Sequence, residues 1–248
     1  MEILPIIFIA FFIAVFFSML GLGGAIIYTP LFFWLDVPLL TAIPMALLLN
    51  MITTASASTT YLKQQLVNKS FAFPMALTAI TGALAGSYLA HKIDTRLIII
   101  LLSIVLFIAG IRILFFNNIG FSVGRDKKKK ILIGSSAAFF IGIISSLVGI
   151  GGGTFIVPLL MILGFKTKNA VGTSAFIITF MSFSGFLGYM SFGSRIDLSL
   201  LVYAGAAAFI GAQVGSKVIF NRISSHTINR MFAIVLLFIA GKLWYGLL

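Results

Sequence analysis

The sequence predicts an all-α polytopic membrane protein made of two inverted repeats, each with a glycine-loop helix pair and three spanning helices. Three observations lead to this fold class: the composition, a series of apolar runs, and a motif that occurs twice. Of the 248 residues, 60% are hydrophobic and 9% are charged, and the mean hydropathy is +1.18. A water-soluble domain of this size could not bury so much apolar surface, so most of the chain is expected to lie in lipid.

The apolar runs divide the chain into ten helical segments. A helix needs about 20 residues to cross the ~30 Å hydrocarbon core, and runs of suitable length recur along the whole chain. Glycine, proline and charged residues mark the boundaries between them. The segments fall, in order, at residues 3–20, 25–35, 38–61, 71–91, 95–116, 131–148, 153–164, 169–192, 197–220 and 226–247.

Three of these segments need a separate justification. The first is predicted to remain in the mature chain, because only Met1 and Glu2 precede it and a secretory signal begins with basic residues. The second and the seventh, 25–35 and 153–164, have only 11 and 12 residues. Segments this short do not span a bilayer alone, which favours half-helices or re-entrant segments.

The same glycine motif precedes both short segments. Its two copies read Gly21-Leu22-Gly23-Gly24-Ala25 and Gly149-Ile150-Gly151-Gly152-Gly153. A proline-leucine pair follows each copy at the same distance, and the offset is 128 residues at every position, Pro30-Leu31 matching Pro158-Leu159. Later matches, such as Gly82-Ala83 with Gly211-Ala212, drift to an offset of 129. The chain is therefore predicted to be an internal duplication.

The basic residues predict how the two repeats are oriented. The repeats occupy 1–116 and 131–248, and a basic linker, 117–130, joins them. If each glycine-motif pair enters and returns on one side, one face receives thirteen of the 17 basic residues: Lys63, Lys69, Arg112, Arg125, Lys127, Lys128, Lys129, Lys130, Lys166, Lys168, Lys217, Arg222 and Arg230. The other face receives Lys92, Arg96, Arg195 and Lys242. The positive-inside rule then places the linker in the cytoplasm and both termini outside. Because each repeat has an odd number of segments, the second is inverted relative to the first.

The glycine motifs predict an anion site. Glycine interrupts a helix, at a cost of about 1 kcal/mol, and permits positive φ. At the start of the next helix, free backbone N–H groups and the positive end of the helix dipole bind anions without a basic side chain. The candidate residues are Gly21, Gly23, Gly24, Ala25, Gly149, Gly151, Gly152 and Gly153. The alternative is that these glycines only allow helices to pack closely.

Polar side chains inside the spans add further candidates, because each costs free energy unless it is paired or hydrated. Neutral hydroxyl and amide donors suit an oxyanion that must be bound and then released. The candidates are Asn50, Thr53, Thr54, Thr173, Ser174 and Gln213. Weaker candidates flank the glycine motifs, namely Ser18, Tyr28, Ser146 and Thr154. The alternative is that such side chains bond back to their own helix or join neighbouring helices.

Several classes of function are disfavoured. All five acidic residues fall at segment ends or in loops, so a carboxylate proton relay is unsupported, while uniport, exchange and coupling through backbone carbonyls stay open. The sequence has no cysteine and only two histidines, so neither a metal centre nor another cofactor is predicted. The charge of +12 is distributed between apolar runs and does not indicate nucleic-acid binding. No intramembrane nucleophile–base constellation suggests an enzyme.

With the paired motif Gly21-Leu22-Gly23-Gly24-x5-Pro30-Leu31 and Gly149-Ile150-Gly151-Gly152-Gly153-x4-Pro158-Leu159, the chain resembles the TauE/SafE sulfite exporter family, also called the toluenesulfonate uptake permease family. The resemblance covers essentially the whole chain. It implies a multi-pass plasma-membrane protein that moves sulfite or another sulfur oxyanion or organosulfonate. The residues alone reach only a small anion, carried by alternating access. The alternatives are a channel-like anion pathway and a membrane-embedded enzyme or assembly subunit, and whether the chain forms a homo-oligomer stays open.

Overall fold

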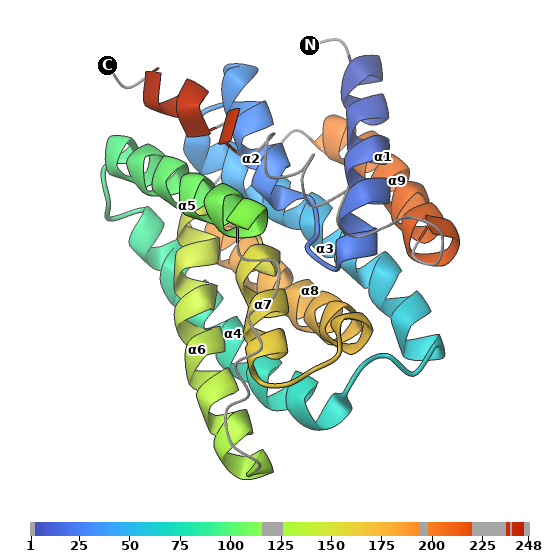
Figure 1. Ribbon diagram of the computed structural model, residues 1–248. Coiled ribbons are helices and arrows are strands. Elements are labelled where there is room, and N and C mark those ends of the chain that lie inside the picture. Colours follow the sequence, from blue (N-terminus) through green and yellow to red (C-terminus); the bar gives the residue numbers. More distant parts are fainter. Residues whose placement is uncertain (1–2, 116–125, 194–197, 220–236, 239, 246–248) are drawn as a thin grey trace.

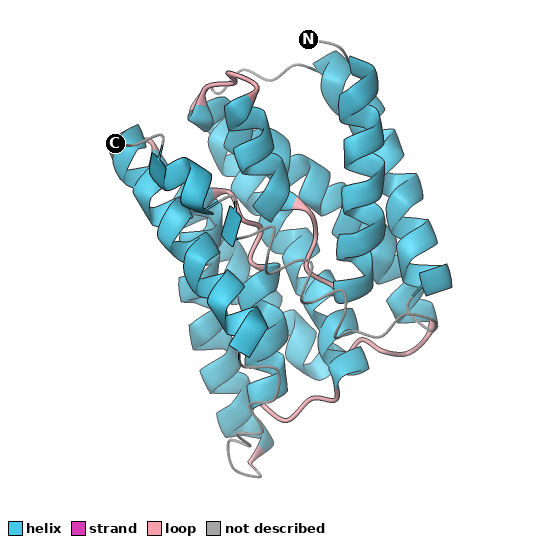
Figure 2. Cartoon of the chain, turned by 45° about the horizontal axis from the view of Figure 1, so that its top comes forward, coloured by secondary structure: helices cyan, strands magenta, loops and turns pink. Residues whose placement is uncertain are grey.

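The computed structural model of the protein describes residues 3–115, 126–193, 198–219, 237–238 and 240–245. These residues form helices and short connections, with no strand among them (Figure 1, Figure 2). The first half contains α1 (Ile3–Leu20), α2 (Ala25–Trp34), α3 (Leu39–Lys63), α4 (Lys69–Ala90) and α5 (Thr95–Phe115). The second contains α6 (Lys127–Val148), α7 (Gly153–Ile162), α8 (Thr167–Ser191), α9 (Leu198–Val214) and the π-helical turn η1 (Gly215–Ile219). The predicted all-α polytopic fold is confirmed.

One predicted boundary is wrong. Helix α6 begins at Lys127 and not at residue 131, so the last four residues of the predicted linker are helical. The cause is Asp126, whose carboxylate accepts a hydrogen bond from the backbone N–H of Lys128 at 2.9 Å. A carboxylate in this position satisfies a free N–H group and interacts favourably with the helix dipole. Most of the predicted segment 226–247 lies outside the described residues.

The duplication is visible in the lengths and positions of the helices. Helices α2 and α7 each have 10 residues, α3 and α8 each have 25, and each member of the second repeat begins 128 residues after its counterpart. Proline follows the glycine loop at the same place in both short helices, as Pro30 and Pro158.

In each repeat, one helix packs closely against a helix of the other repeat. Two glycines of α4 lie so close to α6 that an added Cβ would overlap backbone carbonyl oxygens, Gly82 against Phe139 and Gly86 against Ile143. Two glycines on the α9–η1 segment lie in the same way against α1, Gly211 against Phe11 and Gly215 against Val15. These are the repeat-related residues, so the same contact occurs twice. Because each contact joins one repeat to the other, the repeats form a single unit.

The two glycine-loop hairpins open toward opposite ends of the molecule. Figure 1 shows α1 running down from the N-terminus and α2 returning upward, while α6 rises from the lower end and α7 runs back down. A lysine lies at the C-terminal end of each short helix. Lys130 donates from Nζ to the carbonyl oxygen of Leu163 at 2.8 Å, after α7, and Lys242 Nζ lies 4.1 Å from the ring centre of Trp34, at the end of α2. A cation is favourable at a helix C-terminus.

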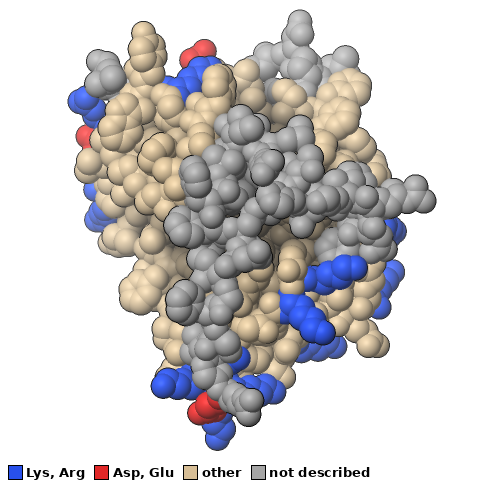
Figure 3. Space-filling model, viewed as in Figure 1, with Lys and Arg blue, Asp and Glu red and all other residues tan. Residues whose placement is uncertain are grey.

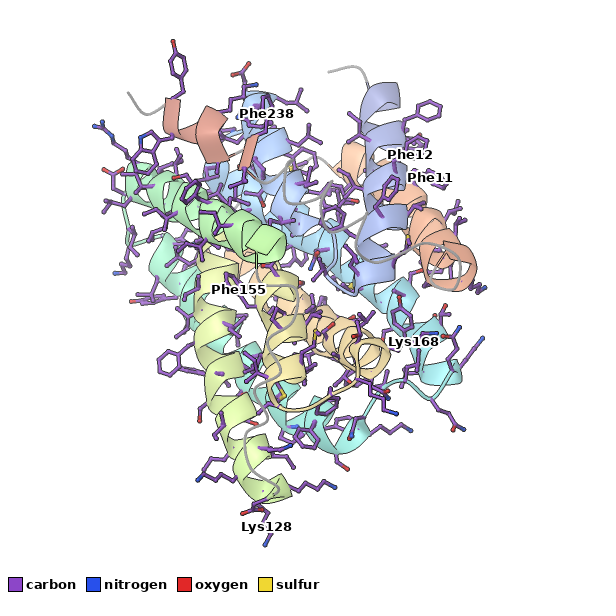
Figure 4. The ribbon with its side chains drawn as sticks, in the orientation of Figure 1. Phe11, Phe12, Lys128, Phe155, Lys168 and Phe238 are labelled. Carbon is purple, nitrogen blue, oxygen red and sulfur yellow. The ribbon has the colours of Figure 1, made fainter. Side chains whose placement is uncertain are left out.

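Helices α3 and α8 form the centre of the fold. Among the described residues, α3, α4, α6 and α8 are long and apolar enough to cross a membrane, and the apolar stretch is 67% buried in α3 and α8 but 44% and 39% buried in α4 and α6. Large apolar side chains on the outer helices are exposed, as expected for contact with lipid, including Leu77, Phe140 and Val202. Basic side chains gather toward the bottom and right of Figure 3, with a second group at the upper left. Lys128 and Lys168 mark the first group (Figure 4).

Candidate functional site

The two glycine loops turn by means of positive φ angles. Gly21 and Gly23 have φ of 63° and 69°, and their counterparts Gly149 and Gly151 have φ of 76° and 74°. Residues that carry a side chain rarely adopt a positive φ, so the glycines are needed for the turn itself. The loops differ at the last position, because Gly24 is right-handed whereas Gly152 has φ of 70°.

The loops meet at the side chain of Asn50, which α3 places in the centre of the molecule with none of its surface exposed. Its Oδ1 accepts a hydrogen bond from the backbone N–H of Ala25 at 2.9 Å, and its Nδ2 donates to Ser182 Oγ at 2.7 Å. A Cβ added at either Gly23 or Gly151 would overlap the Asn50 amide. Asn50 therefore contacts both loops, and the absence of side chains on the two glycines leaves it room.

Direct contacts also tie the loops to one another and to the central helices. Thr29 in α2 donates from Oγ1 to the carbonyl oxygen of Gly149 at 2.5 Å. Ser174 in α8 donates from Oγ to the carbonyl oxygen of Gly21 at 3.0 Å. An added Cβ on Gly153 would overlap the backbone of Leu22. The two predicted half-helices thus begin side by side, and their positive dipole ends face a common buried region.

A repeat-related pair of tyrosines holds the helices that lead into the loops, and sequence reasoning missed it. Tyr61 donates from its hydroxyl to the carbonyl oxygen of Ser18 at 2.6 Å, and Tyr189 donates to that of Ser146 at 3.2 Å. Both tyrosines are fully buried. The 128-residue offset between them, and between the two serines, was the available signal.

The predicted polar residues divide into three groups. Asn50 and Ser174 lie at the loops, as described above. Thr53 and Thr54 bond back to their own helix, to the carbonyl oxygens of Leu49 and Asn50 at 2.8 Å each, as the packing alternative expected. Thr54 also accepts a hydrogen bond from Thr179 Oγ1 at 3.1 Å, which joins α3 to α8 one turn beyond Asn50.

Two predicted residues lie away from the loops. Thr173 accepts a hydrogen bond from the backbone N–H of Asn68 at 3.0 Å and so holds the connection before α4. Gln213 in α9 donates from Nε2 to the carbonyl oxygen and the hydroxyl of Ser56, at 2.9 and 3.0 Å. Gln213 therefore joins α9 to α3, and it also lines a cavity.

This cavity has a volume of about 550 Å³ and lies between the C-terminal part of α3 and the α9–η1 segment. It carries two lysines and several neutral polar groups, and its lining residues are Thr59, Thr60, Lys63, Gln64, Phe209, Gln213 and Lys217. We call it the basic vestibule. Its inner wall holds the hydrogen bond between Ser216 Oγ and Thr60 Oγ1, at 3.2 Å.

At the repeat-related place two aromatic side chains contact one another. The position that corresponds to Lys217 is Tyr88, and the position that corresponds to Gln64 is Phe192. Their ring centres lie 5.7 Å apart, and His91 lies against Phe192 at 4.8 Å. Gly188, in place of Thr60, lets α8 approach Ser87 so closely that an added Cβ would overlap its hydroxyl. One end of the molecule thus has a basic cavity where the other has an aromatic contact.

A polytopic helical fold with two buried glycine loops and a basic cavity on one side is typical of a membrane transporter. The comparisons with known proteins agree with this class. The model of the family described as sulfite exporter TauE/SafE matches residues 6–243, so the chain belongs to that family, as the motifs indicated. It is a family of transporters and not of enzymes.

Curated relatives support the same class. The chain is 28% identical to the probable membrane transporter protein YunE of Bacillus subtilis (strain 168), with 92% of each chain covered. It is 23% identical to a probable membrane transporter protein of Haemophilus influenzae, with 98% of this chain and 95% of that protein covered. A probable membrane transporter protein of Sinorhizobium sp, ORF9, is 25% identical over 87% of this chain and 83% of its own. No solved structure matches the chain significantly.

Proposed function

We propose that this transporter carries a small anion across the plasma membrane by alternating access. The observation that carries the proposal is the meeting of two half-helix N-termini at a buried region around Asn50, where the described residues place no carboxylate and no cation. Backbone N–H groups and two positive dipole ends favour a negative ligand. The lack of a basic side chain keeps the binding weak enough for release.

The shape of the molecule supports a carrier over a channel. The basic vestibule lies at one end, while Tyr88 and Phe192 contact one another at the repeat-related place at the other end, so the two ends differ. The opposed glycine-loop hairpins support inverted repeats, which are typical of carriers that expose one central site to each side in turn (Figure 1).

The substrate class in this proposal comes from the family. The family is described as sulfite exporter TauE/SafE, and we propose sulfite or another sulfur oxyanion or organosulfonate as the anion. Such anions present several oxygen acceptors to donors that point inward from different directions. The hydroxyl, amide and backbone N–H groups around the loops supply donors of this kind.

The proposed orientation places the basic vestibule in the cytoplasm. Lys63 and Lys217 line it, and both belong to the group of thirteen basic residues that the positive-inside rule assigns to the cytoplasmic face. In this orientation both termini are outside. A reporter fused to the C-terminus that is active in the cytoplasm would contradict it.

The test is uptake of labelled sulfite and thiosulfate into proteoliposomes by the native protein and by Gly23→Ala and Gly151→Ala variants. Both substitutions put a methyl group into the Asn50 amide. Gly193→Ala is the matched control, because Gly193 also has positive φ, 78°, but an added Cβ meets nothing within 4 Å. The control separates the cost of the backbone angle from the contact with Asn50.

We expect saturable uptake that is stimulated by the same anion on the opposite side, with loss of uptake in both loop variants and normal uptake in the control. Folding is followed by the elution profile and the melting temperature. Absence of uptake for every sulfur anion would contradict the substrate class. Uptake without exchange stimulation, at rates beyond a carrier cycle, would replace the carrier by a channel.

A further inference from the structure

The two glycine loops are not equivalent, and the difference begins at α2. The N-terminus of α2 already has an acceptor inside the protein, because Asn50 Oδ1 lies 2.9 Å from the backbone nitrogen of Ala25. The amide is held in this orientation by its second hydrogen bond, to Ser182. An amide oxygen is a usual capping group for a helix start. The place that an anion would take at α2 is therefore filled by the protein.

The N-terminus of α7 has no such cap. The residue that corresponds to Asn50 is Ile178, which is fully buried and has no polar atom to offer. Gly152, at the cap position, has no side chain that could cap the helix. Within the described part of the chain, no acceptor bonds to the backbone N–H groups of Gly152, Gly153 and Thr154. Helix α7 thus presents free donors in a buried region, which is costly unless a ligand or water satisfies them.

Three buried hydroxyl groups of α6 and α7 are also unsatisfied. The side chains of Ser145, Ser146 and Thr154 are 1%, 2% and 6% exposed, and their oxygens have no hydrogen-bond partner among the described residues. Ser145 Oγ lies 3.0 Å from the place of a Cβ on Gly152, so it faces the loop. A buried hydroxyl without a partner costs about 1–3 kcal/mol. By contrast, buried Ser and Thr in the central helices, such as Ser184, bond back to their own helix.

The first repeat lacks this set of hydroxyls. Phe17 stands where the second repeat has Ser145, and Ile26 stands where it has Thr154. Ser18, which corresponds to Ser146, donates to the carbonyl oxygen of Val15 at 3.1 Å. The free hydroxyl groups are therefore confined to one of two loops that otherwise share a similar backbone turn.

We propose that the transported oxyanion binds at the N-terminus of α7, between the backbone N–H groups of Gly152 to Thr154 and the hydroxyls of Ser145 and Thr154. The α2 loop is then a structural counterpart that Asn50 caps. The donors come from a loop, from α6 and from α7 itself, so they fit a ligand with several acceptor oxygens, such as sulfite or thiosulfate. All of them are neutral, which allows release. This inference rests on the proposed function and assigns its binding site to one repeat.

The experiment measures sulfite and thiosulfate binding to the purified full-length protein by isothermal titration calorimetry. Thr154→Val keeps the shape of the side chain and removes one hydroxyl, and Ser145→Ala removes a second. Ser135→Ala is the matched control, because Ser135 is also a buried, unpartnered serine of α6 but lies ten residues earlier, roughly 15 Å along the helix. Ser18→Ala is the control in the first repeat.

We expect Thr154→Val and Ser145→Ala each to weaken binding at least tenfold, because a hydrogen bond to a charged group contributes about 1.5–3 kcal/mol. Both controls should bind within twofold of the native protein. All four melting temperatures should stay close to that of the native protein, since three of the four hydroxyls have no partner to lose.

The outcomes separate this inference from the proposed function. If the native protein binds and transports sulfite or thiosulfate but both loop variants bind as it does, the assignment to α7 is wrong and the transport function stands. Equal losses in Ser18→Ala and Thr154→Val would also overturn it, because the two loops would then share the anion. If the native protein neither binds nor transports either anion, both the inference and the proposed function fall.

Discussion

Asn50→Asp perturbs the centre of the candidate site with almost no change of shape. The carboxylate would keep an acceptor on the backbone N–H of Ala25, which lies 2.9 Å from the present amide oxygen. Ser182 Oγ, now an acceptor at 2.7 Å, could rotate its hydroxyl to donate instead. A negative charge at a helix N-terminus is itself favourable by about 0.3–1 kcal/mol. Burial of a carboxylate with no cation nearby among the described residues costs more than this gain, so the variant is expected to fold with a lower melting temperature than the native protein.

The same charge should oppose an anion on α7. The Asn50 amide lies against Gly151, where an added Cβ would overlap it, so the new carboxylate would stand beside the second loop. For an anion whose charge lies about 6 Å from this carboxylate, two unit charges repel by about 3 kcal/mol at an effective dielectric constant of about 20. This corresponds to roughly a hundredfold loss of affinity for a monovalent anion, and more for a divalent one.

The assay is the concentration dependence of thiosulfate uptake into proteoliposomes, with Asn50→Ala as the comparison. The alanine variant loses both hydrogen bonds without adding charge, so it should lose about 2 kcal/mol of stability but keep most of its affinity. The aspartate variant should instead show a KM raised roughly a hundredfold at a pH where the new carboxyl is ionised, together with a lowered melting temperature. Native uptake by a folded aspartate variant would refute the position that we assign to the anion.

Three further predictions concern the vestibule, the packing between the repeats and the asymmetry of the loops. Replacing both Lys63 and Lys217 with Gln should slow uptake from the vestibule side at low ionic strength, and the defect should disappear at about 1 M salt, where screening is nearly complete. Lys92→Gln, at the other end, should not slow uptake. A defect that does not depend on salt would argue against charge attraction. Gly86→Leu should prevent stable folding, because the side chain would enter the backbone of α6, and a monodisperse variant with a native melting temperature would contradict the described packing. Ile178→Asn should cap α7 and weaken sulfite binding at least tenfold, since it introduces an asparagine at the position that corresponds to Asn50. Unchanged binding by a folded variant would count against the α7 site.

Much of the fold could be predicted because it follows from local chemistry. Helix lengths follow from the apolar runs, and the positions of the two loops follow from glycines that have positive φ, such as Gly23 and Gly151. The duplication could be recognised from a constant offset between the motifs. The start of α6 was misplaced, because four consecutive lysines look like a linker when the capping role of Asp126 is not considered.

The candidate site was harder to predict because it depends on contacts between distant segments. Asn50 was identified as a polar residue in a span, but its bonds reach Ala25 and Ser182, which are far away in the sequence. Ser145 gave no signal, since its importance lies in having no partner, and only the packed structure shows this. Thr173 and Gln213, like Asn50, are neutral polar residues inside predicted spans, yet they bond to other elements. Periodicity cannot distinguish these cases.

The asymmetry has a physical reason in a fold of this kind. Two helix N-termini that face one buried region place two partial positive charges close together, which is unfavourable when the region is empty. If side chains capped both helices, no free N–H group would attract an anion. If neither helix were capped, two helix N-termini would destabilise the transporter whenever no anion is bound. Asn50 satisfies α2 permanently, and Ile178 leaves α7 to the ligand. A duplicated fold can thus keep its symmetric packing while only one of its two loops has free hydroxyl groups and no side-chain cap.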